Sequence, residues 1–365
     1  MPIFMDIHIV PGVRAKEVAE AHRMDLLYQD QFECKCMTYW IDEQRENVFC
    51  LIEAPDKESV EEMHSKAHGL VPNKVIEVSS ALVESFLGRI YDPSDAKITD
   101  GIKVFSDPSY RVLLVIRTAD AALLRHKYGM EKTNEWLNTY HDVVRKHAAS
   151  FEGREAEHEG PGFIISFTSA SKAVACAQTI QQEIPAADAA AIDLRLGLSA
   201  GEPIEKSNKL FGDTIHLAEY LCAIGKTSQI AIATTVKELV MKDHPINEKN
   251  RFMCLQPQDE AILKALFAQL EENWQNADFD IDDYCQAMAM SKSQLYRKAI
   301  SLTGFSPNIL LKEFRLEKAK ELMRKQQYPV SQITFEAGFT SPSYFTKCFK
   351  KKYGVLPMAY LDLLH

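Results

Sequence analysis

The sequence has no run of about 18 consecutive apolar residues, the length from which a membrane-spanning helix is inferred. Its amino terminus, Met1–His8, also lacks the basic and apolar regions of a secretory signal peptide. The sequence therefore predicts no contact with a membrane. We expect a cytoplasmic protein.

Paired cysteines are missing as well. The eight cysteines are scattered, and no Cys-X-X-Cys pair of the kind found in zinc and redox sites occurs. This pattern indicates reduced thiols, as in the cytoplasm. The chain is 46% hydrophobic and 25% charged, which is typical of globular proteins, and its 365 residues suit two or three domains.

Basic residues are in deficit overall, but one segment is an exception. Before residue 261 the chain carries 28 Lys and Arg against 40 Asp and Glu, a net charge of −12. From 291 to 352 it carries 13 Lys and Arg against 4 Glu, a net charge of +9. A basic segment in an acidic chain is expected to contact phosphate. The alternative is an ordinary solvated helical face, where Lys and Arg are also common.

The basic segment is predicted to form two helix-turn-helix units in tandem. Ser, Gly and apolar spacing mark the helix ends and buried stripes. The four helices are expected over residues 281–290, 291–303, 330–337 and 341–353. A further helix, 307–325, joins the units; about 19 residues at 1.5 Å each span roughly 29 Å. That length is close to the ~34 Å between successive major-groove faces of DNA, so two recognition helices could enter adjacent grooves.

The second unit resembles the AraC/XylS-type DNA-binding domain. The stretch from Ile333 to Gly354 matches that family's most specific signature, although Val355-Leu356 stands where most members have Ser or Thr before Pro. Gly338 and Phe339 would be structural, because the turn needs a residue that tolerates positive φ and the small core needs an apolar plug. The resemblance implies a transcription regulator that binds double-stranded DNA, with RNA polymerase as a partner if it is an activator.

Family analogy places base contacts near the start of each recognition helix. Arg297 and Gln294 suit guanine and adenine edges, whereas Lys298, Lys350 and Lys351 are expected to bind phosphate. The other expected contacts are Lys292, Ser293, Tyr296, Ser343, Tyr344 and Lys347.

Residues 1–80 predict a ferredoxin-like domain with the order βαββαβ. Strands are expected over 2–10, 32–41, 46–53 and 75–78, and helices over 14–29 and 55–69. The first strand carries Ile3, Met5 and Ile7 on one face. Its other face, with Phe4 and His8, is too apolar for full exposure. We therefore expect another domain or subunit to cover that second face.

This segment resembles a small ferredoxin-like family, some members of which bind nickel. The matching stretches are Met5–His8, Ala21–Asp25, Tyr39–Glu43, Val48–Pro55 and His64–Gly69. His64 and His68 lie one helical turn apart, so both imidazoles can reach one ion.

With His8, His22 and Glu53, this pair forms a candidate ligand set for nickel or another transition metal, since imidazole suits nickel, copper and zinc alike. The alternative is a partly buried helix edge without a metal. If the helices cover the Ile3 face of the first strand, His8 points away from His64 and His68.

Residues 110–255 resemble the class III nucleotide cyclase catalytic domain. The matching stretches are 194–203, 210–218 and 225–233. The two metal-binding Asp residues of that family would fall in Val115–Arg117 and Gly160–Gly162, and its Asn and Arg at His216 and Tyr220. Without the carboxylates that hold two metal ions, we expect no catalysis. Asp213 is expected to cap the next helix.

The sequence thus predicts a multidomain α+β regulator, not an enzyme. Its parts are a ferredoxin-like sensor (1–80), a connector (81–109), a cyclase-like α/β module (110–255) and an all-α tandem helix-turn-helix domain (261–365), with a second connector over 242–259. Since cyclases build their sites at a dimer interface, we expect a homodimer, or a retained nucleotide cleft. The alternatives are an active cyclase coupled to DNA binding and a purely structural protein without salt-dependent DNA affinity.

Overall fold

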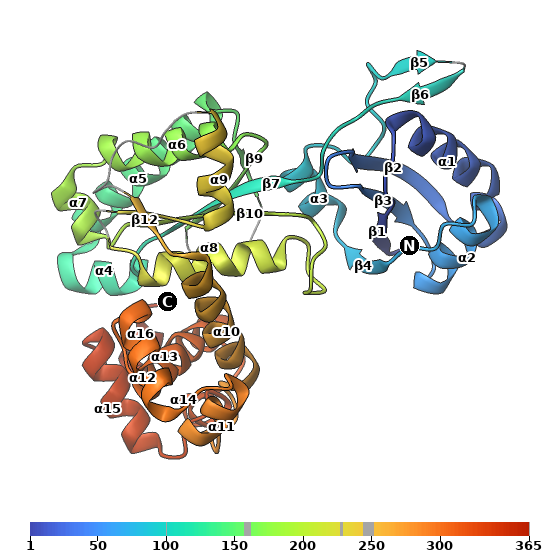
Figure 1. Cartoon of the computed structure of the whole chain (residues 1–365). Helices are drawn as coiled ribbons and strands as arrows, with labels where there is room; N and C mark the ends of the chain where they lie inside the picture. The colour runs from blue at the N-terminus through green and yellow to red at the C-terminus, as the bar shows by residue number, and fades with distance from the viewer. Residues whose placement is uncertain (100, 157–161, 227–228, 244–251, 365) are drawn as a thin grey trace.

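The structure of the chain, a computed structural model, describes residues 1–99, 101–156, 162–226, 229–243 and 252–364. It is a mixed α+β structure with a helical C-terminal region, as the sequence predicts. Figure 1 shows an N-terminal lobe and a central lobe, each built on a sheet, and a helical C-terminal lobe beside the central one. Among the described residues, no helix is both long enough and apolar enough to cross a membrane.

The N-terminal lobe is a four-stranded antiparallel sheet with the strand order β2-β3-β1-β4. Its elements, in the predicted order βαββαβ apart from one short 3-10 helix, are β1 (Ile3–Ile9), α1 (Ala15–Tyr28), η1 (Gln29–Phe32), β2 (Lys35–Asp42), β3 (Asn47–Glu53), α2 (Lys57–Ala67) and β4 (Lys74–Val78).

Strand β1 separates two cores, because alternate side chains point to opposite faces. Phe4 packs with Met63 in the core under α1 and α2. Met5 and Ile7 pack on the other side, in a core shared with the central lobe. The helices therefore cover the Phe4 face and the central lobe covers the Met5 face, the reverse of the arrangement considered from the sequence. This reversal turns His8 toward α2.

The connector contains regular structure that the sequence did not predict: α3 (Ser80–Leu87), β5 (Lys97–Thr99) and β6 (Ile102–Val104). Phe105, just after β6, stacks on Tyr39 at 4.2 Å between ring centroids. Phe86 of α3 lies 5.1 Å from the ring of Phe211 in the central lobe. The connector thus packs on both lobes that it joins.

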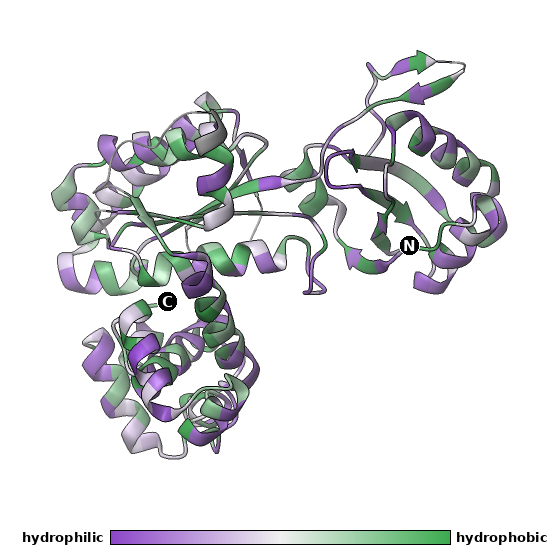
Figure 2. Ribbon diagram, in the orientation of Figure 1, coloured by the Kyte–Doolittle hydropathy of each residue, from purple (hydrophilic) through white to green (hydrophobic). Residues whose placement is uncertain are grey.

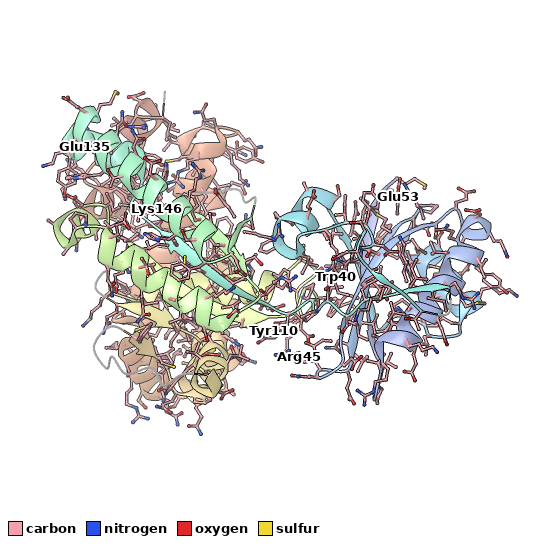
Figure 3. All side chains as sticks on the ribbon, turned by 90° about the horizontal axis from the view of Figure 1, so that it is seen from above. Trp40, Arg45, Glu53, Tyr110, Glu135 and Lys146 are labelled. Atoms are coloured by element: carbon pink, nitrogen blue, oxygen red, sulfur yellow. The ribbon has the colours of Figure 1, made fainter. Side chains whose placement is uncertain are left out.

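Polar contacts also link the two lobes. Figure 3 shows Arg45 beside Tyr110 at this junction, and the guanidinium carbon lies 3.6 Å from the centroid of the tyrosine ring. Lys74 of β4 donates hydrogen bonds of 2.8–2.9 Å to the backbone carbonyls of residues 205–207. These contacts hold the loop that contains residues 205–207 against the N-terminal lobe.

The central lobe is built on a six-stranded sheet with the order β12-β11-β10-β7-β9-β8, in which only the β10–β11 and β11–β12 pairs are parallel. Its elements are β7 (Arg111–Arg117), α4 (Ala121–Tyr128), α5 (Met130–Ser150), β8 (Arg154–Glu155), β9 (Phe163–Phe167), α6 (Ala170–Glu183), α7 (Ala186–Ala191), β10 (Arg195–Gly201), α8 (Gly212–Ile224), β11 (Ile230–Ile232), α9 (Thr234–Asp243) and β12 (Phe252–Cys254). Helices cover both faces of the sheet, and Figure 2 shows that its central strands are mainly hydrophobic.

The C-terminal lobe consists of helices α10 (Pro257–Asn273), α11 (Ile281–Ala287), α12 (Lys292–Thr303), α13 (Pro307–Lys325), α14 (Val330–Glu336), α15 (Pro342–Tyr353) and α16 (Pro357–Asp362). The two helix-turn-helix units are α11–α12 and α14–α15. Gly338 forms the second turn with φ +73°, and a Cβ there would lie 2.2 Å from the carbonyl oxygen of Trp274. Only glycine fits this position without strain.

Asp120 joins the C-terminal lobe to the central lobe. This buried residue caps α4, accepting hydrogen bonds from the backbone N–H groups of Ala122 and Leu123. Its carboxylate also pairs with Arg324 of α13 and accepts a 2.7 Å hydrogen bond from the hydroxyl of Tyr360. Burial alone would raise the pKa of Asp120, but Arg324 and Tyr360 outweigh it and lower the pKa.

Replacing Asp120 by Asn should weaken the docking of the C-terminal lobe by about 2–4 kcal/mol, because Arg324 loses its partner while the helix cap is kept. Since the folded-state pKa is depressed, the contribution of Asp120 is present above the ordinary value of 3.8 and lost as the pH falls below it. Urea unfolding of the full chain measures the effect. Exposed Asp142→Asn on α5 is the control and should unfold like the wild type.

Candidate functional sites: a histidine cluster and two recognition helices

Three histidines and two aspartates meet between β1, α1 and α2, and we call them the histidine cluster. His64 is 1% exposed and lies at its centre. Its Nε2 is 2.9 Å from Oδ2 of Asp6, and its Nδ1 is 3.1 Å from Oδ1 of Asp25. Nε2 of His68 lies 3.1 Å from Nδ1 of His64 and 3.1 Å from Oδ1 of Asp25. The ring of His8 stands edge-on to His64, with 4.8 Å between centroids.

Local structure explains why these side chains meet. Asp6 and His8 are two residues apart on β1 and so share the face that the helices cover. His64 and His68 are four residues apart at the end of α2 and share one face of it. Asp25 lies on the buried side of α1.

The cluster is strongly coupled by charge. Burial would lower the pKa of His64, but the carboxylates of Asp6 and Asp25 outweigh burial and raise it to about 10. Burial would raise the pKa of both carboxyl groups, and their contacts with the histidines lower it instead. At neutral pH the metal-free cluster therefore holds a protonated His64 between two carboxylates.

The donor atoms fit a divalent transition metal ion. They form two groups whose ligand atoms all lie within 4.8 Å of one another, Asp6–His8–Cys50–His64 and Asp25–His64–His68. Nε2 of His8 is buried and has no hydrogen-bond partner among the described residues, although Oδ1 of Asp6 is 3.3 Å away. An ion would give this orphaned nitrogen a partner. Imidazole and carboxylate donors suit nickel, copper and zinc.

Two of the five predicted ligands are not in the cluster, although His22 lines the same pocket as His8, Asp25 and His68. Nε2 of His22 is 3.7 Å from Oδ2 of Asp92 in the connector, and its ring packs on Tyr39. Glu53 pairs with the amino group of Met1 at 3.4 Å. In the β1–β3 register Glu53 is opposite Ile3, whereas Val48 is opposite His8. The structure therefore brings His8, His64 and His68 together without His22 or Glu53.

Sequence reasoning missed Asp6, Asp25 and Cys50 as donors. A signal for Asp6 was present, since a charged residue stands in an otherwise apolar strand two positions from a histidine. Cys50 is buried, and burial together with the Asp6 carboxylate raises the pKa of its thiol well above the usual value.

The recognition helices α12 and α15 match each other at an offset of 50 residues. Ser291 and Ser341 cap them, and Gly304 and Gly354 end them in left-handed conformation. Leu295 and Ala299 of α12, like Phe345 and Phe349 of α15, are buried. The exposed predicted contacts are Lys292, Ser293, Gln294 and Arg297 on α12 and Ser343, Tyr344, Lys347, Lys350 and Lys351 on α15.

The partners of these side chains divide them into two groups. Lys292 pairs with Asp282 at 2.7 Å, and Lys298 pairs with Asp259 at 2.8 Å. Gln294 accepts from the N–H of Ser291 in a capping box, and the hydroxyl of Tyr296 accepts from Asn308. In the part of the chain that the structure describes, no ion pair involves Arg297, Lys347, Lys350 or Lys351, and their charges face solvent.

The cyclase-like positions contain no pair of metal-binding carboxylates among the described residues. Arg117, at the end of β7, pairs with Glu219 of α8. Tyr220 is buried and stacks on Phe267 of α10 at 4.3 Å. Asp213 does not cap α8, because Phe211 occupies the cap position. The carboxylate of Asp213 instead accepts a 2.7 Å hydrogen bond from the N–H of Ser207. The predicted positions 160 and 161 lie outside the described residues.

Two family models match the chain. A helix-turn-helix domain covers residues 284–362, and the family described as nickel responsive protein SCO4226-like covers residues 4–78. The histidine kinase P4 of Formosa agariphila is 38% identical over 102 residues, which are 28% of this chain and 7% of that protein.

Two further relatives match single regions. The transcriptional regulator MtrA of Neisseria gonorrhoeae is 31% identical over 99 residues, 27% of this chain and 31% of MtrA. A protein of Rhizobium meliloti named as an adenylate cyclase is 29% identical over 140 residues, 36% of this chain and 24% of that protein. The chain thus spans less than a third of the length of each of these relatives.

These matches define the class of each terminal region. The C-terminal region is an AraC-type helix-turn-helix domain, which is the DNA-binding domain of transcriptional regulators. The N-terminal region matches the SCO4226-like family, and a further segment of the chain is similar to a protein named as an adenylate cyclase. The resemblances inferred from the sequence are confirmed.

Proposed function

We propose that this protein is a transcriptional regulator that binds two adjacent major-groove segments of double-stranded DNA with residues 261–365. The observation that carries the proposal is the pair α12 and α15, which expose polar residues at equivalent positions on either side of the 19-residue helix α13. At 1.5 Å per residue this helix is about 29 Å long, close to one turn of B-DNA.

The proposed DNA contacts follow from exposure and charge. We assign base contacts to Ser293, Gln294 and Arg297 of α12 and to Ser343, Tyr344 and Lys347 of α15, and phosphate contacts to Lys350 and Lys351. Lys292 and Lys298 are neutralised by acidic partners. For this reason we assign them smaller contributions than the sequence alone suggests.

The experiment is a selection of bound fragments from sheared genomic DNA with the full-length protein. We expect one enriched motif with two half-sites about 10 base pairs apart, one helical turn of DNA. Fragments without a common motif would contradict sequence-specific binding and leave only general affinity for phosphate.

For the N-terminal lobe we propose a ferredoxin-like metal sensor. Asp6, His8 and His64 would hold a nickel or other transition metal ion, with Cys50 in reach, and Asp25 and His68 would position His64. The ion would supply a fixed link between β1 and α2. Since Met5 and Ile7 on the other face of β1 pack against the central lobe, a change in β1 reaches that lobe directly.

For the central lobe we propose a cyclase-like fold that has lost catalysis and serves a homodimer. The support is the Arg117–Glu219 ion pair, which places a cation at the strand end where a cyclase needs a metal-binding carboxylate. A regulator that acts on DNA belongs in the cytoplasm, and an activator would also contact RNA polymerase.

The full chain should make no cyclic nucleotide from ATP or GTP with magnesium or manganese, because no carboxylate pair holds the two ions. Product is measured by chromatography after long incubation at high protein concentration. Turnover that disappears in Asp213→Ala or His216→Ala would support the second candidate function, an active cyclase coupled to DNA binding.

A further inference from the structure

A cavity of about 280 Å³ lies where the connector meets the central lobe, away from the histidine cluster and the recognition helices. Its walls are the end of α3, the segment before β7 and the strands β8 and β9. Three arginines and two carboxylates carry the charge of the lining. These residues are Arg89, Arg111, Arg154, Asp107 and Glu152.

Both carboxylates already have cationic partners. Asp107 accepts from Nε of Arg89 at 3.1 Å, and Glu152 pairs with Lys172 at 2.5 Å. Among the described residues, neither Arg111 nor Arg154 forms an ion pair. The three arginines of the lining therefore outnumber its two carboxylates, and the charge of Asp107 acts on both Arg89 and Arg111.

Arg111 is the more unusual of the two, because it is only 5% exposed. Its guanidinium donates to the backbone carbonyls of Phe86, Leu87, Pro108 and Tyr110 at 2.7–3.2 Å. These neutral dipoles hold the group in place without cancelling its charge. Burial lowers the pKa of Arg111 to about 10; the Asp107 carboxylate opposes this shift, and the nearby Arg154 and Arg89 add to it. A buried cation without a directly paired carboxylate is costly.

Arg154 completes the cationic wall from β8. Its guanidinium packs directly against Gly88, where a Cβ would lie 2.9 Å from the guanidinium carbon. Gly88 also has a φ of +87°, a conformation that glycine adopts without strain. The close approach keeps Arg154 folded over the cavity although the residue is exposed.

We propose that this cavity binds a small organic oxyanion, a phosphate ester or a carboxylate, whose charge Arg111 and Arg154 neutralise. The exposed guanidinium of Arg154 can bind either kind of anion through paired hydrogen bonds. Arg111 already makes four hydrogen bonds to carbonyls, so it contributes mainly its charge. The volume lies near the lower end of the ~300–1,000 Å³ typical of small-molecule pockets, so the ligand is a compact metabolite. This site is additional to the proposed metal site.

The position of the cavity gives the ligand a means of regulation. Arg89 in its wall donates a 2.6 Å hydrogen bond to the carbonyl of Tyr39 in β2, and Arg111 begins β7 of the central lobe. An anion held between these groups would contact residues at the junction of the N-terminal and central lobes. The protein would then respond to two inputs, a metal and an anionic metabolite.

The test uses the full chain, with ribose 5-phosphate, citrate and inorganic phosphate as probes at constant ionic strength set by sodium chloride. Thermal unfolding and calorimetric titration should show saturable binding of at least one of the two organic anions. The ribose 5-phosphate and citrate arms separate a phosphate ester from a carboxylate. Inorganic phosphate measures how much of the affinity comes from the charged group alone.

Arg154→Gln is the informative variant, because Arg154 is exposed and its loss leaves the folded core intact, whereas Arg111 supports four backbone carbonyls. We expect about 10- to 100-fold weaker binding, because the variant loses one or two charge-assisted hydrogen bonds to the anion. Arg145→Gln is the matched control, since Arg145 is an exposed arginine of the same lobe outside the cavity. Wild-type affinity in Arg154→Gln, or no binding of either organic anion, would overturn the proposal.

Discussion

Replacing Arg297 by alanine should weaken binding to the selected DNA site by about 1–3 kcal/mol and relax its specificity at one position. Arg297 is exposed on α12 and forms no ion pair within the described residues, so its guanidinium is free to meet a guanine edge. Lys347, the equivalent residue of α15 at the 50-residue offset, should show a comparable loss when replaced by alanine. The double variant should lose roughly the sum, since the two helices meet separate half-sites.

Fluorescence anisotropy on a labelled duplex measures these losses, and a salt series separates base contacts from phosphate contacts. Wild-type affinity should fall steeply as salt rises. Lys350→Ala and Lys351→Ala should each make that dependence shallower by about one counterion while leaving the preferred sequence unchanged. Arg23→Ala, an exposed arginine on α1, is the control. A flat salt response, or equal affinity in the wild type and the double variant, would contradict the assigned interface.

The helical C-terminal region was the most predictable part of the molecule, because its fold is encoded locally. Caps, terminating glycines and buried stripes recur twice along the chain, and each signal depends only on residues within one or two turns. The joining helix is Pro307–Lys325 in the structure, as predicted. What the sequence did not give was the ion pairing of Lys298, because its partner Asp259 belongs to α10, 39 residues earlier.

Helix α10 itself was missed for a different reason. We interpreted Pro257 as part of a connector, whereas proline is also favoured in the first turn of a helix, where its missing N–H costs nothing. Because residues 242–259 are predicted as a connector, β12 is not predicted either. A short edge strand such as Phe252–Cys254 carries little periodicity, and it is defined by pairing with β11.

The histidine cluster shows how far a local pattern determines a site. The His64–His68 pair follows from helical spacing alone, and the structure does bring the two rings together. Whether His8 joins them depends on which face of β1 the helices cover, and both faces are apolar enough to be buried. Met5 and Ile7 of β1 pack toward the central lobe, together with Phe49 of β3. That choice depends on another domain, which no pattern within the first 80 residues describes.

Removing His64 should abolish metal binding by the full chain, with a loss of affinity of more than about 100-fold for whichever of nickel, copper or zinc binds most tightly. Substituting residues that merely hold a metal ligand already costs about 10- to 100-fold. Asp25→Asn should fall in that lower range, since Asp25 lies 3.1 Å from Nδ1 of His64. His68→Ala tests the other histidine of the helical pair. Because His68 is less buried than His64, this variant can be measured even if the His64 variant misfolds.

His22→Ala and Glu53→Gln provide matched controls, because both residues belong to the ligand set predicted from the sequence but lie outside the cluster. Their affinities should stay within about threefold of the wild type, well below the tenfold change that 1.4 kcal/mol represents. Calorimetric titration of all the variants with the three ions measures this contrast. Loss of binding in His22→Ala, with unchanged binding in His64→Ala and His68→Ala, would move the site to the contact between His22 of α1 and Asp92 of the connector.

The pH dependence gives a second readout on the wild-type protein. A metal ligand must be deprotonated, and the pKa of His64 is raised from 6.5 to about 10 by its two carboxylates. Between these values the ion must displace one proton, so affinity should rise about tenfold per pH unit. Titrations in buffers of different ionisation enthalpy should show about one proton released per ion at pH 7, and an affinity independent of pH would exclude His64 as a ligand.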